Sequence, residues 1–312
     1  MGGNNLHKYF RAIGFSEPMT RKGQQALINE VLLQPSYRGY TTKPAGEDGE
    51  RDENGNETLL AEFRMEFAKN CGVTVCGEFD GADHFSYNYC YPYLSGSRIS
   101  TLEEVTVEQR IFNESYAGIC DDLKVGVTLI FHLQNVIDYV KLLGANALPS
   151  CGTSVSLAGL ASEGTIMMPI LKTDYERKAK KQENVQRVKL LNAARTGDED
   201  AMENLTLEDM DIYAAISQKI QQEDVYSLVD SYFMPYGVEC DLYSVLGEIR
   251  TVEMTKNRLT EEEICLMTID CNDLLFDVCI NKEDLYGEPA VGRRFKGVVW
   301  MQGTINFPQA LQ

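Results

Sequence analysis

The sequence is poor in the residues and motifs that carry most enzyme chemistry. Its 312 residues include only three histidines and one tryptophan. They contain no glycine-rich phosphate loop, no GxSxG nucleophile motif, no HExxH pair and no CxxC zinc spacing. These absences argue against the enzyme classes that local motifs identify, and they predict neither a metal site nor a cofactor.

Positive charge is scarce as well. The chain has 29 Lys and Arg against 47 Asp and Glu, which gives a formal net charge of −18. Such a charge repels phosphate backbones and anionic membrane surfaces, so nucleic acid is not expected as the principal partner. The longest apolar run, residues 125–131, is too short to span a bilayer, and the first residues lack a secretory-signal pattern. We therefore expect a cytoplasmic protein without a membrane partner.

The nine cysteines are an odd number and form no paired ligand spacing. In a cytoplasmic chain they are expected to be reduced, structural thiols. Cys240 lies between Glu239 and Asp241, and adjacent negative charge opposes a reactive thiolate. We expect Cys240 to be an inward-facing residue of a strand.

Residues 1–172 are predicted to form an α+β domain. Two short helical patterns open it, the second beginning after Thr20, and an acidic segment over residues 41–57 is expected to be a mobile surface loop. Apolar residues then alternate with polar ones in four segments between residues 59 and 111, which predicts an antiparallel meander. A helix is expected over residues 133–143 and a hairpin over residues 153–170, turning at Ser162, Glu163 and Gly164.

Residues 173–233 are predicted to form a helical connector. Its first half is basic and its second half acidic, which favours a helical hairpin whose members neutralise each other. A basic helix that docks onto an acidic partner or RNA is the alternative. A short helix ending near Tyr232 is expected to close the connector.

Residues 234–312 are predicted to form a small OB-like β barrel. The segment contains a long first strand, two strands joined at Asn272–Asp273, a helical turn after Asn281 and one or two closing strands. Arg294 and Trp300 are expected on the outer face of the last strand. Two outward charges and one ring are too few for a single-strand site, so we expect no measurable binding to mixed DNA or RNA oligomers at physiological salt.

Two groups of residues are candidates for a site. Tyr87, Tyr89 and Tyr91 share a predicted strand face, where they could stack on a ligand or belong to the core. Arg110 and His132 are further polar candidates for ligand binding. The carboxylates Glu108, Glu114, Asp121 and Asp122 are expected to be surface charge, with acid–base work or cation binding as the alternative.

Several stretches of the chain resemble an uncharacterised protein family of clostridial-type bacteria. They include "LHKYFRAIGFSEPMTRK", "ESYAGICDDLKVGVTLIFHLQN", "LTLEDMD", "FMPYGVECDLYSVLGEI" and "GRRFKGVVWMQGTINF". These stretches are spread over nearly the whole length, so the resemblance is to the entire protein. It implies a free-standing bacterial protein and no particular activity.

The sequence favours a non-catalytic binding or adaptor protein for an unknown protein or small-molecule ligand. The first alternative is a carboxylate-dependent hydrolase or metal-assisted enzyme that uses Glu108, Glu114, Asp121 and Asp122. The second alternative is nucleic-acid binding through the OB-like barrel.

Limited proteolysis tests the predicted organisation. We expect the first cut within residues 41–57 and the next near Gly197, because neither segment offers apolar residues that would hold it in place. Mass spectrometry of the fragments identifies the cut sites. A first cut inside one of the alternating segments between residues 59 and 93 would contradict the predicted sheet.

Overall fold

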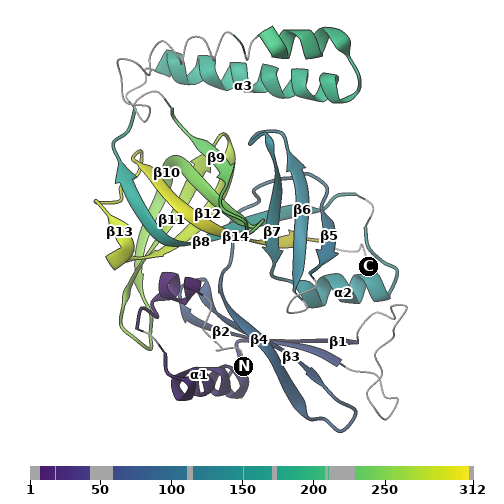
Figure 1. Ribbon diagram of the computed structural model, residues 1–312, viewed down its shortest axis with the longest axis vertical. Helices are drawn as coiled ribbons and strands as arrows, with labels where there is room; N and C mark the ends of the chain where they lie inside the picture. The colour runs from purple at the N-terminus through teal and green to yellow at the C-terminus, as the bar shows by residue number, and fades with distance from the viewer. Residues whose placement is uncertain are drawn as a thin grey trace.

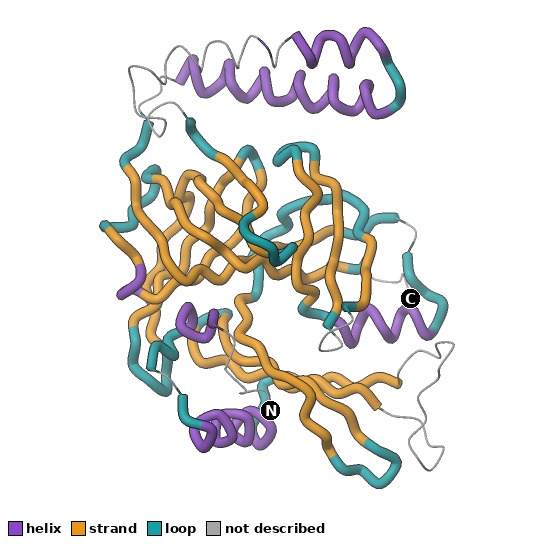
Figure 2. Tube along the Cα trace, in the orientation of Figure 1, coloured by secondary structure: helices purple, strands orange, loops and turns teal. Residues whose placement is uncertain are grey.

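The computed structural model describes residues 8–17, 19–42, 59–110, 115–149, 151–170, 174–207, 210 and 229–308. Strands dominate this part of the chain (Figure 2). They form a four-stranded sheet and a ten-stranded sheet, part of which closes into a barrel. The acidic segment over residues 41–57 lies outside the described residues apart from its first two, as do residues 211–228 of the predicted connector.

The smaller sheet is an antiparallel meander in the order β1-β2-β3-β4. Its strands are β1 (Tyr37–Thr42), β2 (Leu59–Ala68), β3 (Cys71–Phe79) and β4 (Phe85–Leu94). Asn70 takes a positive φ of 58° in the two-residue turn between β2 and β3, a conformation that asparagine tolerates better than most residues. The N-terminal 3₁₀ helix η1 (Lys8–Ile13) and helix α1 (Arg21–Leu33) pack against this sheet.

The barrel closes five strands in the order β8-β12-β11-β10-β14 and back to β8. Its strands are β8 (Ser154–Met167), β10 (Leu242–Lys256), β11 (Glu263–Cys271), β12 (Leu274–Asn281) and β14 (Arg294–Asn306). The pairing of β8 with β12 is parallel and the other four pairings are antiparallel. Strand β8 precedes the helical connector in the sequence, whereas the other four barrel strands follow it. The barrel is therefore built from both parts of the chain.

Strand β14 also extends the barrel into a second wall. At Gln302 and Gly303 it pairs in parallel with β7 (Val127–Leu133), which continues through β6 (Tyr116–Asp122) to β5 (Thr106–Gln109). The short strands β9 (Tyr232–Pro235) and β13 (Leu285–Tyr286) add to β10 and β8, and η2 (Lys282–Asp284) precedes β13. Helix α2 (Val136–Gly144) follows β7 (Figure 1).

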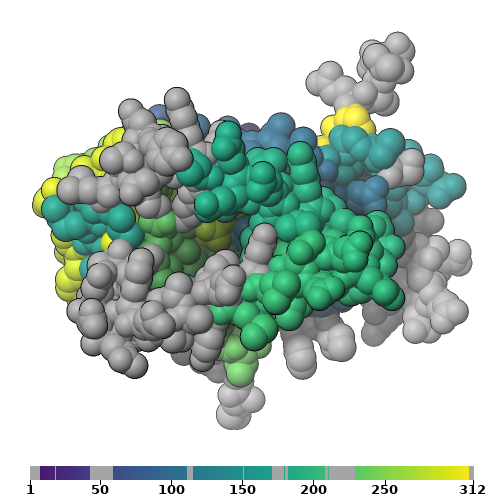
Figure 3. All heavy atoms as spheres, turned by 90° about the horizontal axis from the view of Figure 1, so that it is seen from above, coloured from purple at the N-terminus to yellow at the C-terminus, as the bar shows by residue number. Residues whose placement is uncertain are grey.

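The helical connector lies at one end of the molecule. Helix α3 (Asp174–Arg195) and a second helical segment over residues 199–207 run side by side above the barrel and the β6–β7 hairpin. Figure 3 looks down on them. Arg195 contacts Asp121 of that hairpin, with 3.3 Å between Nη2 and Oδ2, and so ties the end of α3 to the larger sheet.

Several sequence predictions are confirmed. The fold is mixed α+β with an antiparallel sheet and a closed barrel, α1 begins after the N-cap Thr20, and Asn281 caps η2. The β11–β12 hairpin turns at Asn272 and Asp273, both with positive φ, as a two-residue turn of this hand requires.

The predicted hairpin over residues 153–170 is wrong, because β8 is one continuous strand. Its turn-like residues mark a bulge instead: Glu163 pairs with Val298 and Ala161 with Val299, so Ser162 is the extra residue. Gly164 has a close-packing role, since a Cβ there would lie 2.4 Å from the ring of Phe295.

Three other expectations are corrected. The last of the four alternating segments forms β5 of the larger sheet and does not belong to the meander. The meander instead gains β1, which precedes the other three strands in the sequence. The helix predicted from residue 133 begins at Val136, because β7 continues to Leu133. Tyr232 begins strand β9, which pairs with β10, instead of ending a helix.

A buried amide network joins the small sheet to β14. The Gln302 side chain is fully buried, and its Nε2 donates to the carbonyl of Pro92 at 2.8 Å. Its Oε1 accepts from the backbone N–H of Leu94 at 3.1 Å and from Nε2 of Gln134 at 2.8 Å. One side chain therefore satisfies groups on β4 and at the end of β7, and fixes the two sheets against each other.

We expect Gln302→Leu to lower the free energy of unfolding by about 3 kcal/mol, because buried polar groups that lose a partner cost about 1–3 kcal/mol each. Urea unfolding measures this change. Gln25→Leu, at an exposed position of α1, is the matched control and should change stability by less than about 0.5 kcal/mol. Equal effects of the two substitutions would contradict the role of the network.

Candidate functional site

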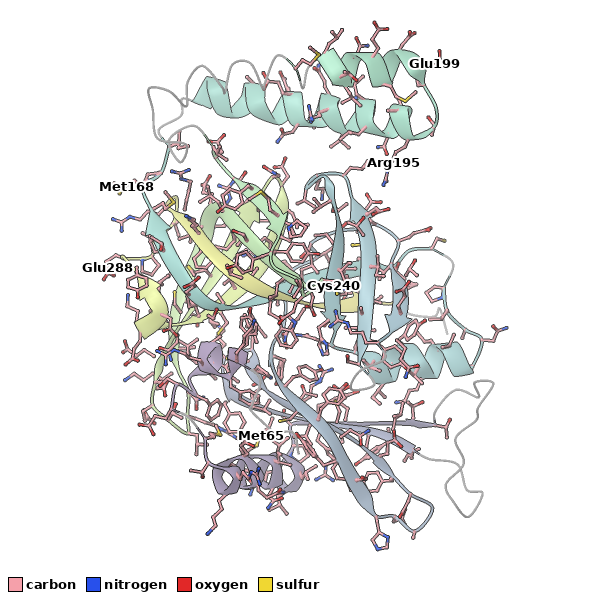
Figure 4. All side chains as sticks on the ribbon, in the orientation of Figure 1. Met65, Met168, Arg195, Glu199, Cys240 and Glu288 are labelled. Atoms are coloured by element: carbon pink, nitrogen blue, oxygen red, sulfur yellow. The ribbon has the colours of Figure 1, made fainter. Side chains whose placement is uncertain are left out.

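An open pocket of about 850 Å³ lies where the small sheet, the β5–β7 wall and the barrel meet. Its walls come from β4, from β5 to β7, from Trp300 of β14, from Lys8 of η1 and from the loop before β10. Cys240, which belongs to that loop and lines the pocket, lies near the centre of the view in Figure 4. The pocket has the size of a small-molecule binding site.

Strand alternation builds one wall of the pocket. Ala117 pairs with both Glu108 and His132, and Ile119 pairs with Ile130, so these side chains share one face of β5, β6 and β7. All five line the pocket. Residues at the positions between them, such as Leu129 and Phe131 on β7, belong to the hydrophobic core.

The adjoining wall is aromatic. Trp300 lies 5.3 Å from the His132 ring and 6.4 Å from the Tyr91 ring, centroid to centroid, and Tyr89 stacks on Tyr91 at 6.1 Å. Tyr91 and His132 contact edge to face at 4.4 Å. Burial raises the pKa of the Tyr89 and Tyr91 phenols well above their ordinary value, so both stay neutral.

Asp241 holds the aromatic wall and the β5 end together. Its Oδ2 accepts a hydrogen bond from Trp300 Nε1 at 2.9 Å and lies 2.9 Å from Nη1 of Arg110. Its backbone carbonyl accepts from the N–H of Met301 at 2.8 Å. The carboxylate is only 4% exposed, so these partners replace most of its contact with water.

Charged groups and a thiol surround the mouth. Lys8 Nζ lies 3.5 Å from Glu239 Oε2, and Arg110 Nη2 approaches the Sγ of Cys240 at 3.5 Å. Glu108 is exposed and, in the described part of the chain, forms no ion pair. The arrangement offers the partly exposed Tyr89 ring, apolar side chains and carboxylates to an organic ligand.

The structure brings six of the sequence candidates together in this pocket: Tyr89, Tyr91, Glu108, Arg110, His132 and Trp300. Tyr87 lies outside it, 38% exposed, with its hydroxyl 3.5 Å from the Sγ of Cys90. The shared face predicted for the β4 tyrosines is interrupted, because the β3–β4 register shifts between Cys76 and Gly77.

The three candidate carboxylates that the structure describes do not converge in one pocket. Glu108 lines the large pocket, whereas Asp121 and Asp122 line a separate pocket of about 230 Å³ beside Arg195 of α3. Asp121 is four residues beyond the partner of Glu108 on β6, about 13 Å along the strand. Glu114 lies outside the described residues.

Arg294, Trp300 and Cys240 are placed differently from the prediction. Arg294 is 7% exposed and donates to the carbonyls of Met168 and Val229. Trp300 is 5% exposed and stacks on Tyr9 at 5.7 Å, because η1 covers this part of the barrel. Cys240 is exposed, because β10 begins only at Leu242.

Sequence reasoning missed the loop over residues 236–241 and Lys8 as parts of the site. The signal at the loop was the pair of acids beside an exposed turn, after Gly237 with its positive φ of 70°. No sequence signal pointed to Lys8, because η1 reaches the pocket only through long-range packing.

Two searches of the described residues give negative findings. No three His, Cys, Asp or Glu side chains there are grouped so that they could hold a metal ion. No helix in the same part of the chain is long and apolar enough to cross a membrane.

Comparison with known proteins agrees with the resemblance seen in the sequence. A family model described as a domain of unknown function with an E. rectale gene description (DUF3881) matches residues 10–303. The chain belongs to this family. The match covers nearly the whole length, so the pocket lies within the family's domain. No curated protein and no solved structure matches the chain.

We expect Asp241→Ala to lower the free energy of unfolding by about 2–3 kcal/mol, because Trp300 Nε1 and the Arg110 guanidinium lose a charged partner. The emission of Trp300, the only tryptophan, should also shift to the red as water reaches the indole. Urea unfolding followed by fluorescence measures both changes.

Glu239→Ala is the neighbouring control. Its ion pair with Lys8 is more than half exposed on both sides, so it contributes about 0–1 kcal/mol. If Asp241→Ala left both stability and emission at the level of Glu239→Ala, the buried carboxylate would not hold the wall.

Proposed function

We propose that the protein is a non-catalytic binding protein that holds a small-molecule ligand in the pocket between the small sheet and the β5–β7 wall. The observation that carries this proposal is the convergence of Tyr89, Tyr91 and Trp300 in one 850 Å³ pocket. Ligand sites are concave, largely apolar and supplied with a few polar groups, and this pocket has each property. The compartment proposed from the sequence is the cytoplasm.

The rigidity of the wall supports binding. The indole of Trp300 is fixed by Asp241 on one side and by the Tyr9 ring on the other. Side chains that are already ordered lose little conformational entropy when a ligand arrives. A ligand therefore meets a preorganised wall, in which Tyr89 is the partly exposed ring.

The carboxylate-dependent enzyme has less support as an alternative. Acid–base chemistry by a carboxylate pair needs the two groups within about 10 Å across one substrate. Glu108 lies about 13 Å along β6 from Asp121 and lines a different pocket from Asp121 and Asp122. Asp121 and Asp122 are successive strand residues, so their side chains point to opposite faces of the sheet.

Nucleic-acid binding through an OB-like barrel is also less favoured. Arg294 and Trp300 are six residues apart on β14, about 20 Å along the strand, and both are buried. A groove that binds single-stranded nucleic acid needs exposed Lys or Arg side chains beside exposed aromatic rings.

Filling the pocket tests the proposal. We expect some members of a library of ring-containing fragments to raise the melting temperature of the protein, since they bind only the folded state. Ile119→Trp places a large side chain on the pocket wall and should abolish these shifts. Ile99→Trp makes the same change at a 57% exposed position outside the pocket and should leave them intact.

A thiol readout on the unaltered protein accompanies this test. Alkylation of Cys240 by iodoacetamide should slow when a fragment that raises the melting temperature is bound, whereas alkylation of the exposed Cys151 should not. Peptide mass spectrometry follows both sites. Fragments that stabilise Ile119→Trp equally and leave Cys240 unprotected would place binding elsewhere, and a library with no stabilising fragment would also contradict the proposal.

A further inference from the structure

The charges in the pocket are unequal. Its described lining includes three carboxylates, on Glu108, Glu239 and Asp241, and two cations, on Lys8 and Arg110. Each cation is paired with a carboxylate of the same pocket, Lys8 with Glu239 and Arg110 with Asp241. The lining therefore has a formal charge of −1, and Glu108 carries the charge that these pairs leave over.

The aromatic wall has the same electrostatic preference. The face of an aromatic ring carries partial negative charge and attracts a cation within about 6 Å of its centre. The chain already places one ammonium group at this cluster: Lys8 Nζ lies 5.2 Å from the centroid of Tyr9, whose ring stacks on Trp300.

We propose that the ligand is a small organic cation, with an ammonium or guanidinium group on an apolar or ring-shaped body. This inference rests on the proposed function, because it specifies the ligand of the same pocket. The body packs against the partly exposed side chains of Tyr89, Ile119 and Ile130, and Glu108 balances the positive charge.

An anionic ligand does not fit this arrangement. A phosphate or carboxylate would have to take Lys8 or Arg110 from its present partner and leave a pocket carboxylate uncompensated. The net charge of −18 on the whole chain adds to this repulsion and draws cations towards the mouth.

Three probes of similar size separate the charge preference from binding itself. Benzyltrimethylammonium is the cation, 2-phenylethanol the neutral compound and phenylacetate the anion. Titrations are followed by calorimetry and by the fluorescence of Trp300, the single tryptophan. We expect the cation to bind about tenfold more tightly than the neutral probe, as a desolvated cation–π contact allows, and the anion to bind most weakly.

A pair of variants then tests whether Glu108 is the carboxylate that attracts the cation. Glu108→Gln should weaken binding of benzyltrimethylammonium about threefold without affecting 2-phenylethanol. Glu104→Gln removes the same charge from an exposed position that lines a different pocket, so it should change neither affinity.

The outcomes distinguish the two proposals. If 2-phenylethanol or phenylacetate binds as tightly as the cation, the pocket is a binding site but the proposed ligand class is wrong. If Glu104→Gln weakens binding of the cation as much as Glu108→Gln does, the preference for a cation comes from the overall charge of the protein, and the assignment to Glu108 is wrong. If none of the three probes binds while library fragments still raise the melting temperature, the proposed ligand class is wrong and the pocket remains a binding site.

Discussion

The buried carboxylate of Asp241 is the constraint on which the pocket depends. It receives the indole N–H of Trp300 and the guanidinium of Arg110, and its backbone receives the N–H of Met301. A carboxylate at 4% exposure is stable only when such donors replace water. The same group therefore orients the stacking ring, anchors the end of β5 and fixes the loop that carries Cys240. The pocket keeps its shape because one charge joins three separate segments.

Strand β14 explains why these segments meet where they do. It pairs with β10 and β8 inside the barrel and with β7 outside it, so the barrel and the β5–β7 wall share one backbone. Gln302 on the same strand binds the backbone of β4 and brings the small sheet to this seam. The barrel, the β5–β7 wall and the small sheet meet at this seam, and a pocket lies at their junction. Aromatic and charged side chains line that pocket instead of filling it.

The sequence predicted most strands, because alternation and turn chemistry are local properties. Asn272–Asp273 and the Thr20 and Asn281 caps were found in this way. Long-range pairing has no such signal. Ser162 sits in a bulge rather than a turn because β14 and β12 lie on either side of β8. Trp300 is buried because η1, almost 300 residues earlier, covers it. Six site residues were found by chemical type, whereas their convergence required the fold.

The central claim is that this pocket binds an organic ligand, and the most direct test uses the single tryptophan. Fluorotryptophan incorporated at Trp300 gives one ¹⁹F NMR signal from the pocket wall. Addition of benzyltrimethylammonium should shift this signal in a saturable manner. The shift should disappear in Ile119→Trp, whose added tryptophan gives a second ¹⁹F signal that is resolved from that of Trp300. A Trp300 signal that stays unchanged up to saturating cation, or that shifts equally when the pocket is filled, would contradict the claim.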